Sequence, residues 1–164
     1  YFMNTDTDGE GPSYTADLGS MLLRLDWQSE SRVMAVFDSY VALLDPRTGT
    51  ETARYSYGGA TLQSVALGRR QTALLLNVRG GNSLVTLSET LAPMSEIPAR
   101  QAFGVSATDT DIYLLCPDAV ECYGYDGVQK WVQNDLASRP LAVLNAAQTL
   151  VFTGSRVKEL NAPA

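Results

Sequence analysis

The chain has 164 residues, of which 45% are hydrophobic and 18% are charged, and its net charge at pH 7 is −6. This composition is that of an ordinary globular protein, and the negative charge without any basic run disfavours a nucleic-acid partner. The chain contains no histidine, which removes the commonest general base and the commonest zinc ligand. The sequence identifies no set of ligands for a cofactor either, so we expect no catalytic residue, metal or cofactor.

The N-terminal stretch 1–12 is polar and precedes the first predicted strand, SYTADL at 13–18. It opens with YFMN and continues as TDTDGEGPS, a pattern expected when a transmembrane anchor or signal segment has been removed. A removed tag or an arbitrary truncation is the alternative. Acidic residues over 6–17 match a calcium loop in part, but the strand begins inside that loop, so we interpret 1–12 as a polar linker.

Four repeats of one strand pattern follow, at about 19–58, 59–98, 99–138 and 139–164. Each repeat predicts a first strand that ends in a turn, then two apolar strands. The most apolar second strands are predicted at 32–37, 72–77, 111–116 and 149–154. Equivalent positions in them are Val36, Leu75, Leu114 and Val151, which are 39, 39 and 37 residues apart. Weaker outer strands are predicted at 51–57, 93–98 and 128–133, as is usual for sheet edges.

A period near 39 residues with four short strands per period predicts an all-β fold, a β-propeller of about four antiparallel blades. One small twisted sheet cannot cover both of its faces, so copies must bury one another. The last repeat lacks an outer strand, and strand 13–18 is expected to supply it within one domain over 13–164. A β-sandwich, or a partial propeller completed by a second subunit, remains the alternative.

The corner between the third and fourth strands contains a turn in two of the repeats. LLDPRTG (43–49) places Asp45 before Gly49, and DGVQKW (126–131) places Asp126 and Gly127 before Trp131. The aspartates can accept backbone N–H bonds inside the turn, and the glycines can take positive φ. These corners resemble the quinoprotein-type (PQQ-like) propeller repeat, in which the tryptophan packs against the neighbouring blade. Nothing in the sequence identifies the calcium and quinone ligands of the enzymes with that repeat.

The chain more broadly resembles an uncharacterised family of Gram-positive bacterial proteins with a membrane anchor and an extracytoplasmic propeller-like domain. The resemblance rests on GEGPSYTADLGS (9–20), DSYVALLDPRTG (38–49) and DIYLLCPDAVECYGYDG (111–127). It implies a location outside the cell membrane and a propeller shape. The family has no established activity that could be carried over to this chain.

Two groups of side chains remain as candidates, one for a disulfide and the other for a binding surface. Cys116 and Cys122 flank PDAVE, where a disulfide requires a loop of odd length, and two packed free thiols are the favoured state. Four tyrosines alternate in pairs along strands and are expected either to pack between blades or to line a protein- or glycan-binding surface: Tyr55, Tyr57, Tyr123 and Tyr125.

The charged residues in the turns are explained by structural roles rather than by a functional site. Asp109 and Asp111 fit a turn between strands, and Arg69, Arg70 and Arg79 fit solubilising turns at opposite ends of one sheet. We therefore expect a non-catalytic extracytoplasmic scaffold that binds a protein or a cell-envelope polymer. The alternatives are a glycan-active enzyme that uses carboxylates such as Asp109 and Asp111, or a structural oligomer that completes a larger ring.

Overall fold

The computed structural model describes residues 19–136, 139–145, 149–154 and 156–160, which form two compact units. Unit 1 is Tyr1–Gly59 and unit 2 is Ala60–Ala164, and each is described by itself. The predicted linker at 1–12, the acidic segment at 6–17 and the strand at 13–18 lie outside the described residues. The single domain over 13–164 stays a prediction.

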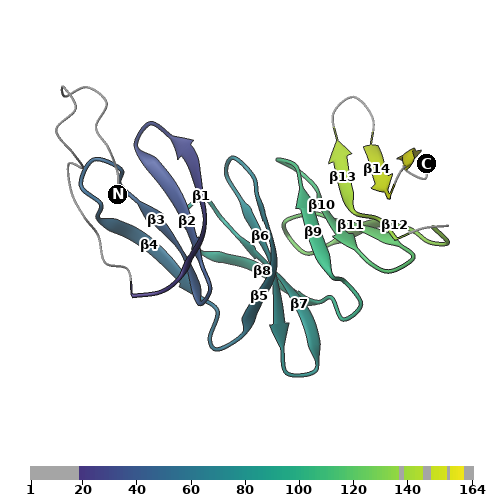
Figure 1. Ribbon diagram of the computed structural model, residues 1–164, viewed down its shortest axis with the longest axis horizontal. Coiled ribbons are helices and arrows are strands. Elements are labelled where there is room, and N and C mark those ends of the chain that lie inside the picture. The colour runs from purple at the N-terminus through teal and green to yellow at the C-terminus, as the bar shows by residue number, and fades with distance from the viewer. Residues whose placement is uncertain (1–18, 137–138, 146–148, 155, 161–164) are drawn as a thin grey trace. The chain divides into compact units, whose positions relative to one another are not determined.

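Unit 1 contains one antiparallel sheet in the order β1-β2-β3-β4 (Figure 1). Its strands are β1 (Leu22–Ser29), β2 (Arg32–Phe37), β3 (Tyr40–Leu44) and β4 (Glu51–Ser56). One face of this sheet carries a buried cluster in which the rings of Phe37 and Tyr40 stack 4.4 Å apart. The predicted four-stranded blade is therefore confirmed for the first repeat.

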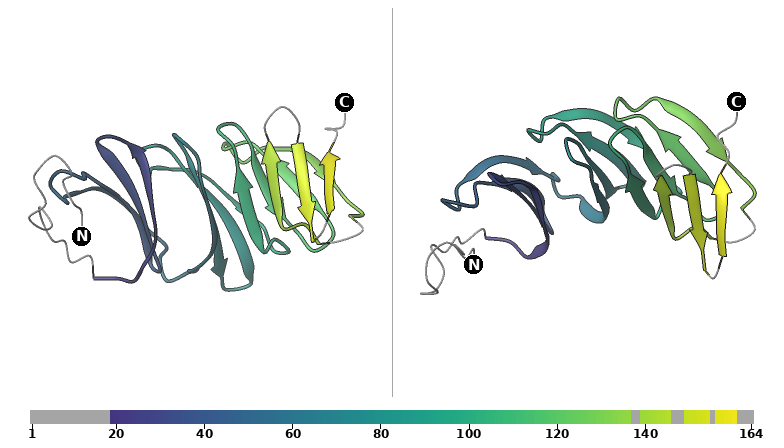
Figure 2. Two further views of the ribbon diagram at one scale, coloured as in Figure 1. Left: turned by 45° about the horizontal axis from the view of Figure 1, so that its top comes forward. Right: turned by 90° about the horizontal axis from the view of Figure 1, so that it is seen from above.

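Unit 2 contains three sheets that follow one another along the chain (Figure 2). The second sheet has β5 (Thr61–Leu67), β6 (Thr72–Val78), β7 (Gly81–Leu87) and β8 (Pro93–Pro98). The third sheet has β9 (Gly104–Ala107), β10 (Ile112–Leu115), β11 (Val120–Tyr123) and β12 (Gln129–Gln133). In the described part of the fourth sheet lie β13 (Ala142–Asn145), β14 (Thr149–Thr153) and β15 (Arg156–Leu160).

The burial of each strand explains why middle and outer strands could be distinguished from the sequence. The middle strands β2, β3 and β10 are buried at nearly every position, because a strand covered on both faces needs a continuous apolar run. The outer strands β4 and β8 alternate between exposed and half-buried residues. The all-β prediction and the order of strands within each repeat are confirmed.

Two buried cores hold unit 2 together. The first core lies between the second and third sheets and includes Leu75, Leu84, Ile112, Leu114 and Tyr125. The second lies between the third and fourth sheets and includes Tyr113, Leu115, Cys122, Val143 and Val151. Successive first strands also touch, since β9 contacts both β5 and β13.

The predicted equivalence of Leu75 and Leu114 is wrong by one residue. In the turns 68–71 and 108–111, the N–H of the first residue donates to the carbonyl oxygen of the fourth, at 2.9 and 2.8 Å. Alignment on these matching turns places Leu114 level with Leu74 instead of Leu75. Leu75 and Leu114 accordingly enter the same core from opposite sheets, because adjacent strand residues point to opposite faces.

Candidate functional site

The corner of the first sheet is a closed turn. Gly49 has a φ of 71°, and its N–H donates to the carbonyl oxygen of Asp45 at 2.8 Å. The Asp45 carboxylate accepts the backbone N–H of Arg47 at 2.8 Å, which holds the start of the turn. Asp45 and Gly49 thus have the turn geometry that their spacing indicated.

The corner of the third sheet has a second role, since it touches the second sheet. Asp126 Oδ1 accepts the N–H of Val128 at 3.0 Å, and Gly127 has a φ of 82°. A Cβ on Gly127 would lie 3.0 Å from Cβ and Oγ of Ser95 on β8. The adjacent Tyr125 carbonyl accepts the hydroxyl of the buried Thr86 at 2.7 Å. This corner therefore connects the second and third sheets.

Trp131 lies on β12 opposite Cys122 and is half-buried. Its ring centroid is 5.9 Å from that of Tyr113, and Trp131 packs against the buried core to which Tyr113 belongs. Trp131 therefore borders the core that the third and fourth sheets of unit 2 share.

The two cysteines are free thiols, so a disulfide between Cys116 and Cys122 is a wrong alternative. Cys116 N donates to Ala119 O at 3.0 Å, which makes Pro117-Asp118 a two-residue turn, and Cys122 pairs with Tyr113. The two thiols then point to opposite faces of the sheet. Cys116 enters the first core of unit 2, and Cys122 enters the second.

We expect both thiols to resist modification in the folded protein. Burial and the neighbouring Glu121 carboxylate raise the pKa of Cys116 to about 11. Burial and nearby Asp111 raise the pKa of Cys122 to about 12. Because the thiolate is the reactive form, Ellman's reagent at pH 8 should label neither cysteine until denaturant is added. Without any reductant it should then titrate two thiols per chain, and a count of zero would contradict the free-thiol assignment.

Three of the four candidate tyrosines are buried, so they do not form a binding surface. Tyr57 OH donates to Phe37 O at 3.2 Å, Tyr123 OH donates to a Glu121 carboxylate oxygen at 2.7 Å, and Tyr125 OH donates to Thr108 O at 2.9 Å. Burial raises the pKa of Tyr125 to about 12, with the nearby Asp109 and Asp111 carboxylates adding to the effect. These tyrosines pack within their units, while Tyr55 on β4 is half-buried.

Asp109 and Asp111, the carboxylates suggested for a glycan-active enzyme, lie in the turn between β9 and β10. Lys130 Nζ lies 2.5 Å from Oδ1 of Asp111. Burial alone would raise the pKa of Asp111, but hydrogen bonds from Lys130 and Thr110 outweigh it and hold the pKa below its ordinary value. Asp111 is therefore ionised and poorly suited to donate a proton. Asp109 accepts the backbone N–H of Arg69 at 3.4 Å.

Within 19–136 and the described segments beyond it, there is no group of three or more Cys, Asp or Glu side chains that could hold a metal ion. The same part of the chain has no helix long and apolar enough to cross a membrane.

An exposed apolar stretch on and just before β1 was missed at the sequence level, and we name it the β1 surface. It comprises Met21, Leu22, Leu23, Leu25 and Trp27, which are 46–63% exposed. Large apolar residues that stay this exposed at five neighbouring positions are unusual on a globular protein. The alternation in LLRLDW indicated a strand with one apolar face, but not that this face would remain uncovered.

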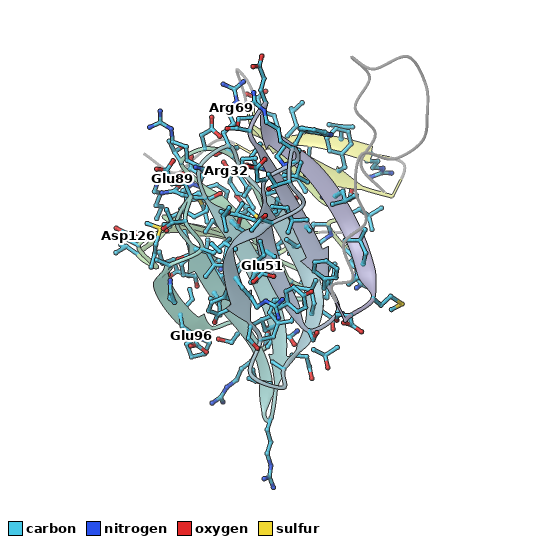
Figure 3. All side chains as sticks on the ribbon, turned by 90° about the vertical axis from the view of Figure 1, so that its left-hand side faces the viewer. Arg32, Glu51, Arg69, Glu89, Glu96 and Asp126 are labelled. Atoms are coloured by element: carbon cyan, nitrogen blue, oxygen red, sulfur yellow. The ribbon has the colours of Figure 1, made fainter. Side chains whose placement is uncertain are left out.

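A second feature is a pair of adjoining hollows at one end of unit 2, which we name the arginine hollow. One part has a volume of about 280 Å³ and is lined by Arg79, Asn82, Glu96 and Arg100 among others. The other part, of about 230 Å³, is lined by Arg100, Leu114, Cys116 and Glu121 among others. Arg69 and Glu89 lie toward the opposite end of the second sheet from Glu96 (Figure 3), which agrees with the predicted separation of Arg69 from Arg79.

No family model and no curated protein matches the chain, whereas many solved structures do. The chain is similar to the computationally designed Ika4 protein, with a TM-score of 0.71 and 10% identity over 95% of this chain and 100% of that one. It is similar to the β-propeller domain of Cps50 (Swd1) from Myceliophteria thermophila, with a TM-score of 0.65 and 13% identity over 86% of this chain and 51% of that one.

It is also similar to BBS1N, solved in complex with ARL6DN, with a TM-score of 0.66 and 16% identity over 90% of this chain and 54% of that one. The chain thus spans about half the length of the Cps50 and BBS1N chains. At these identities the likeness concerns the fold and not the activity. With the antiparallel four-stranded sheets, it shows that this chain has the all-β fold of β-propeller domains.

Proposed function

We propose that this protein is a non-catalytic assembly scaffold outside the cell membrane, and that it associates with a second copy of itself through the β1 surface. The observation that carries the proposal is the exposure of Leu25 and Trp27, at 47% and 63%, on a strand at the edge of its sheet. The location follows from the resemblance to membrane-anchored extracytoplasmic proteins.

Among the described residues, β1 is an edge strand of its sheet. In the order β1-β2-β3-β4 it has β2 as its only neighbour within the sheet. In unit 2, by contrast, β9 is the first strand of the third sheet, and it contacts the first strands of the two neighbouring sheets, β5 and β13. A long, apolar edge strand is a template for pairing with another chain. β1 therefore has both an apolar face and an edge that a partner can cover.

The charges on β1 favour a second copy as that partner. Arg24 and Asp26 flank Leu25, and within one copy they form an ion pair at 2.9 Å. If two copies of β1 pair antiparallel about a two-fold axis at Leu25, each Arg24 lies opposite Asp26 of the other copy. The same register places Leu25 opposite Leu25 of the other copy. Opposite charges and apolar pairs that face each other across strands stabilise such a ladder, and a two-fold interface requires this self-complementarity.

The competing functions lack a comparable observation. The carboxylates named for a glycan-active enzyme are held in a turn, where Asp111 is paired with Lys130. Three of the tyrosines that could have lined a glycan-binding surface are buried.

Charge reversal tests the proposed assembly. We expect the unmodified chain to sediment as a dimer that dissociates on dilution. Arg24→Asp places like charges opposite each other at two symmetry-related positions, so it should weaken dimerisation by roughly tenfold or more. The double variant Arg24→Asp/Asp26→Arg restores opposite charges in the same register and should restore the dimer.

Arg47→Asp is the matched control, because it reverses an exposed arginine in a turn of the same unit. It should leave the dissociation constant unchanged. A chain that is monomeric at every soluble concentration overturns the proposal. A double variant that stays as weak as Arg24→Asp overturns the register at Leu25 and, with it, the edge pairing.

A further inference from the structure

We infer that the arginine hollow of unit 2 binds an acidic peptide segment of a partner protein. This inference goes beyond the assembly through β1, because it concerns another unit and another chemistry. The hollow is formed by the β6–β7 turn, the connection from β8 to β9 and the turn between β10 and β11. Its two parts share Pro98 and Arg100, so Arg100 lies between them.

These loops meet at one end of the unit, as their backbone hydrogen bonds show. Phe103 N, in the β8–β9 connection, donates to Leu115 O at 2.9 Å, beside the β10–β11 turn. Leu136 N, which follows β12, donates to Asp118 O in that turn at 2.8 Å. The connections between sheets thus lie against the turns within sheets and form a continuous rim.

The stem of Arg100 lies close to a glycine. Gly81 has a φ of 135°, and a Cβ at this position would lie 3.2 Å from Cγ and 3.4 Å from Cβ of Arg100. The absence of a side chain at Gly81 lets the Arg100 stem lie against the backbone of the β7 start.

The two carboxylates of the hollow keep their charge but are hydrogen-bonded to hydroxyl groups, whereas its two guanidinium groups have no hydrogen-bond partner among the described residues. Glu96 accepts the hydroxyl of Ser83 at 3.0 Å, and Glu121 accepts the hydroxyl of Tyr123 at 2.7 Å. Over the described part of the chain, neither Arg79 nor Arg100 has a hydrogen bond or ion pair. The groups available to a ligand are therefore two guanidinium ions that line the same cavity.

A third arginine lies against the connection between β8 and β9. The Arg139 guanidinium lies 3.6 Å from the centroid of the Phe103 ring, in the connection that also carries Arg100. Guanidinium groups bind carboxylates through two parallel hydrogen bonds, and stacking on an aromatic ring leaves those donors free. Arg139 is therefore a further guanidinium group that a carboxylate of a bound peptide could reach beside the connection that carries Arg100.

The intervening negative charges argue against a uniform polyanion. Asp118 lies in the turn between β10 and β11, and Glu121 lines the hollow. A polyphosphate or nucleic-acid backbone would meet repulsion at these positions. A peptide can place neutral residues there and carboxylates opposite the arginines, so an acidic peptide is the ligand that fits.

The test uses the full chain and a fluorescein-labelled peptide of alternating glutamate and glycine, read out by fluorescence anisotropy. We expect saturable binding that weakens with added salt. Binding should fall by roughly tenfold when Gln replaces Glu in the peptide, or when Arg79→Gln and Arg100→Gln are combined in the protein. The matched control is Arg70→Gln, which removes an exposed arginine at the other end of β6 and should change nothing.

Three outcomes overturn the inference: no binding, an equal loss with Arg70→Gln, or displacement of the peptide by tripolyphosphate at matched charge. The measurement is repeated in the Arg24→Asp background, which lacks the proposed β1 pairing. Failure of the assembly through β1 and failure of the peptide site are then separate results.

Discussion

Gly127→Ala is expected to destabilise unit 2 by about 2–4 kcal/mol. Gly127 has a φ of 82°, so any side chain there adopts the costly left-handed conformation. The new Cβ would also lie 3.0 Å from Ser95 and 3.3 Å from Ile97 on the neighbouring sheet. Ser95 has little room to move, because its hydroxyl bonds with Thr86 at 2.8 Å.

Unfolding should be followed by the fluorescence of Trp131, which lies in unit 2, in a Trp27→Phe background that removes the only other tryptophan. Gly154→Ala is the matched control. Gly154 also has positive φ, at 56°, but a Cβ there meets nothing within 4 Å. It should lose only about 1–2 kcal/mol, the cost of the conformation alone. Equal losses for the two variants would show that the corner does not press against the second sheet.

Trp131→Ala is expected to lower the free energy of unfolding by about 2–4 kcal/mol. The change removes the ring that packs 5.9 Å from Tyr113 and borders the core between the third and fourth sheets. The cost lies toward the lower part of the range for buried aromatics, because Trp131 is half-buried. Urea unfolding monitored by circular dichroism measures the loss.

The chain contains its own control, since its other tryptophan is exposed. Trp27 is 63% exposed on β1, so Trp27→Ala should change the stability of the monomer by less than about 0.5 kcal/mol. Trp131→Phe should recover part of the loss, because it keeps an aromatic ring against Tyr113. If both alanine variants were equally stable, Trp131 would not join the third and fourth sheets.

The two corners show which properties of a turn can be predicted from the sequence of a repeat. Asp45–Gly49 and Asp126–Gly127 have the turn geometry that their residue types require, because these requirements are local. The contact of Gly127 with Ser95 joins positions on different sheets, and nothing in the spacing of either segment indicates it. A corner motif therefore identifies a turn but not the surface against which the turn packs.

The directions of the cysteines could be predicted from the sequence, whereas the burial of the tyrosines could not. The Pro-Asp turn sets the hairpin register by itself, so the opposed directions of Cys116 and Cys122 follow from counting residues. Whether Tyr123 and Tyr125 are covered depends on a neighbouring sheet, and the structure places both in a buried core.

The sequence by itself determined the all-β class, the order of the strands and the turns within each repeat, because each depends on the alternation of apolar residues and on turn chemistry within a few positions. Only the tertiary structure decided which faces are covered, as for Leu75 and Leu114, which enter one core from two sheets. It also decided that the apolar side chains of β1 stay exposed and that Arg79 and Arg100 line one cavity. These features arise where separate segments meet, and the local pattern of either segment does not specify its neighbour.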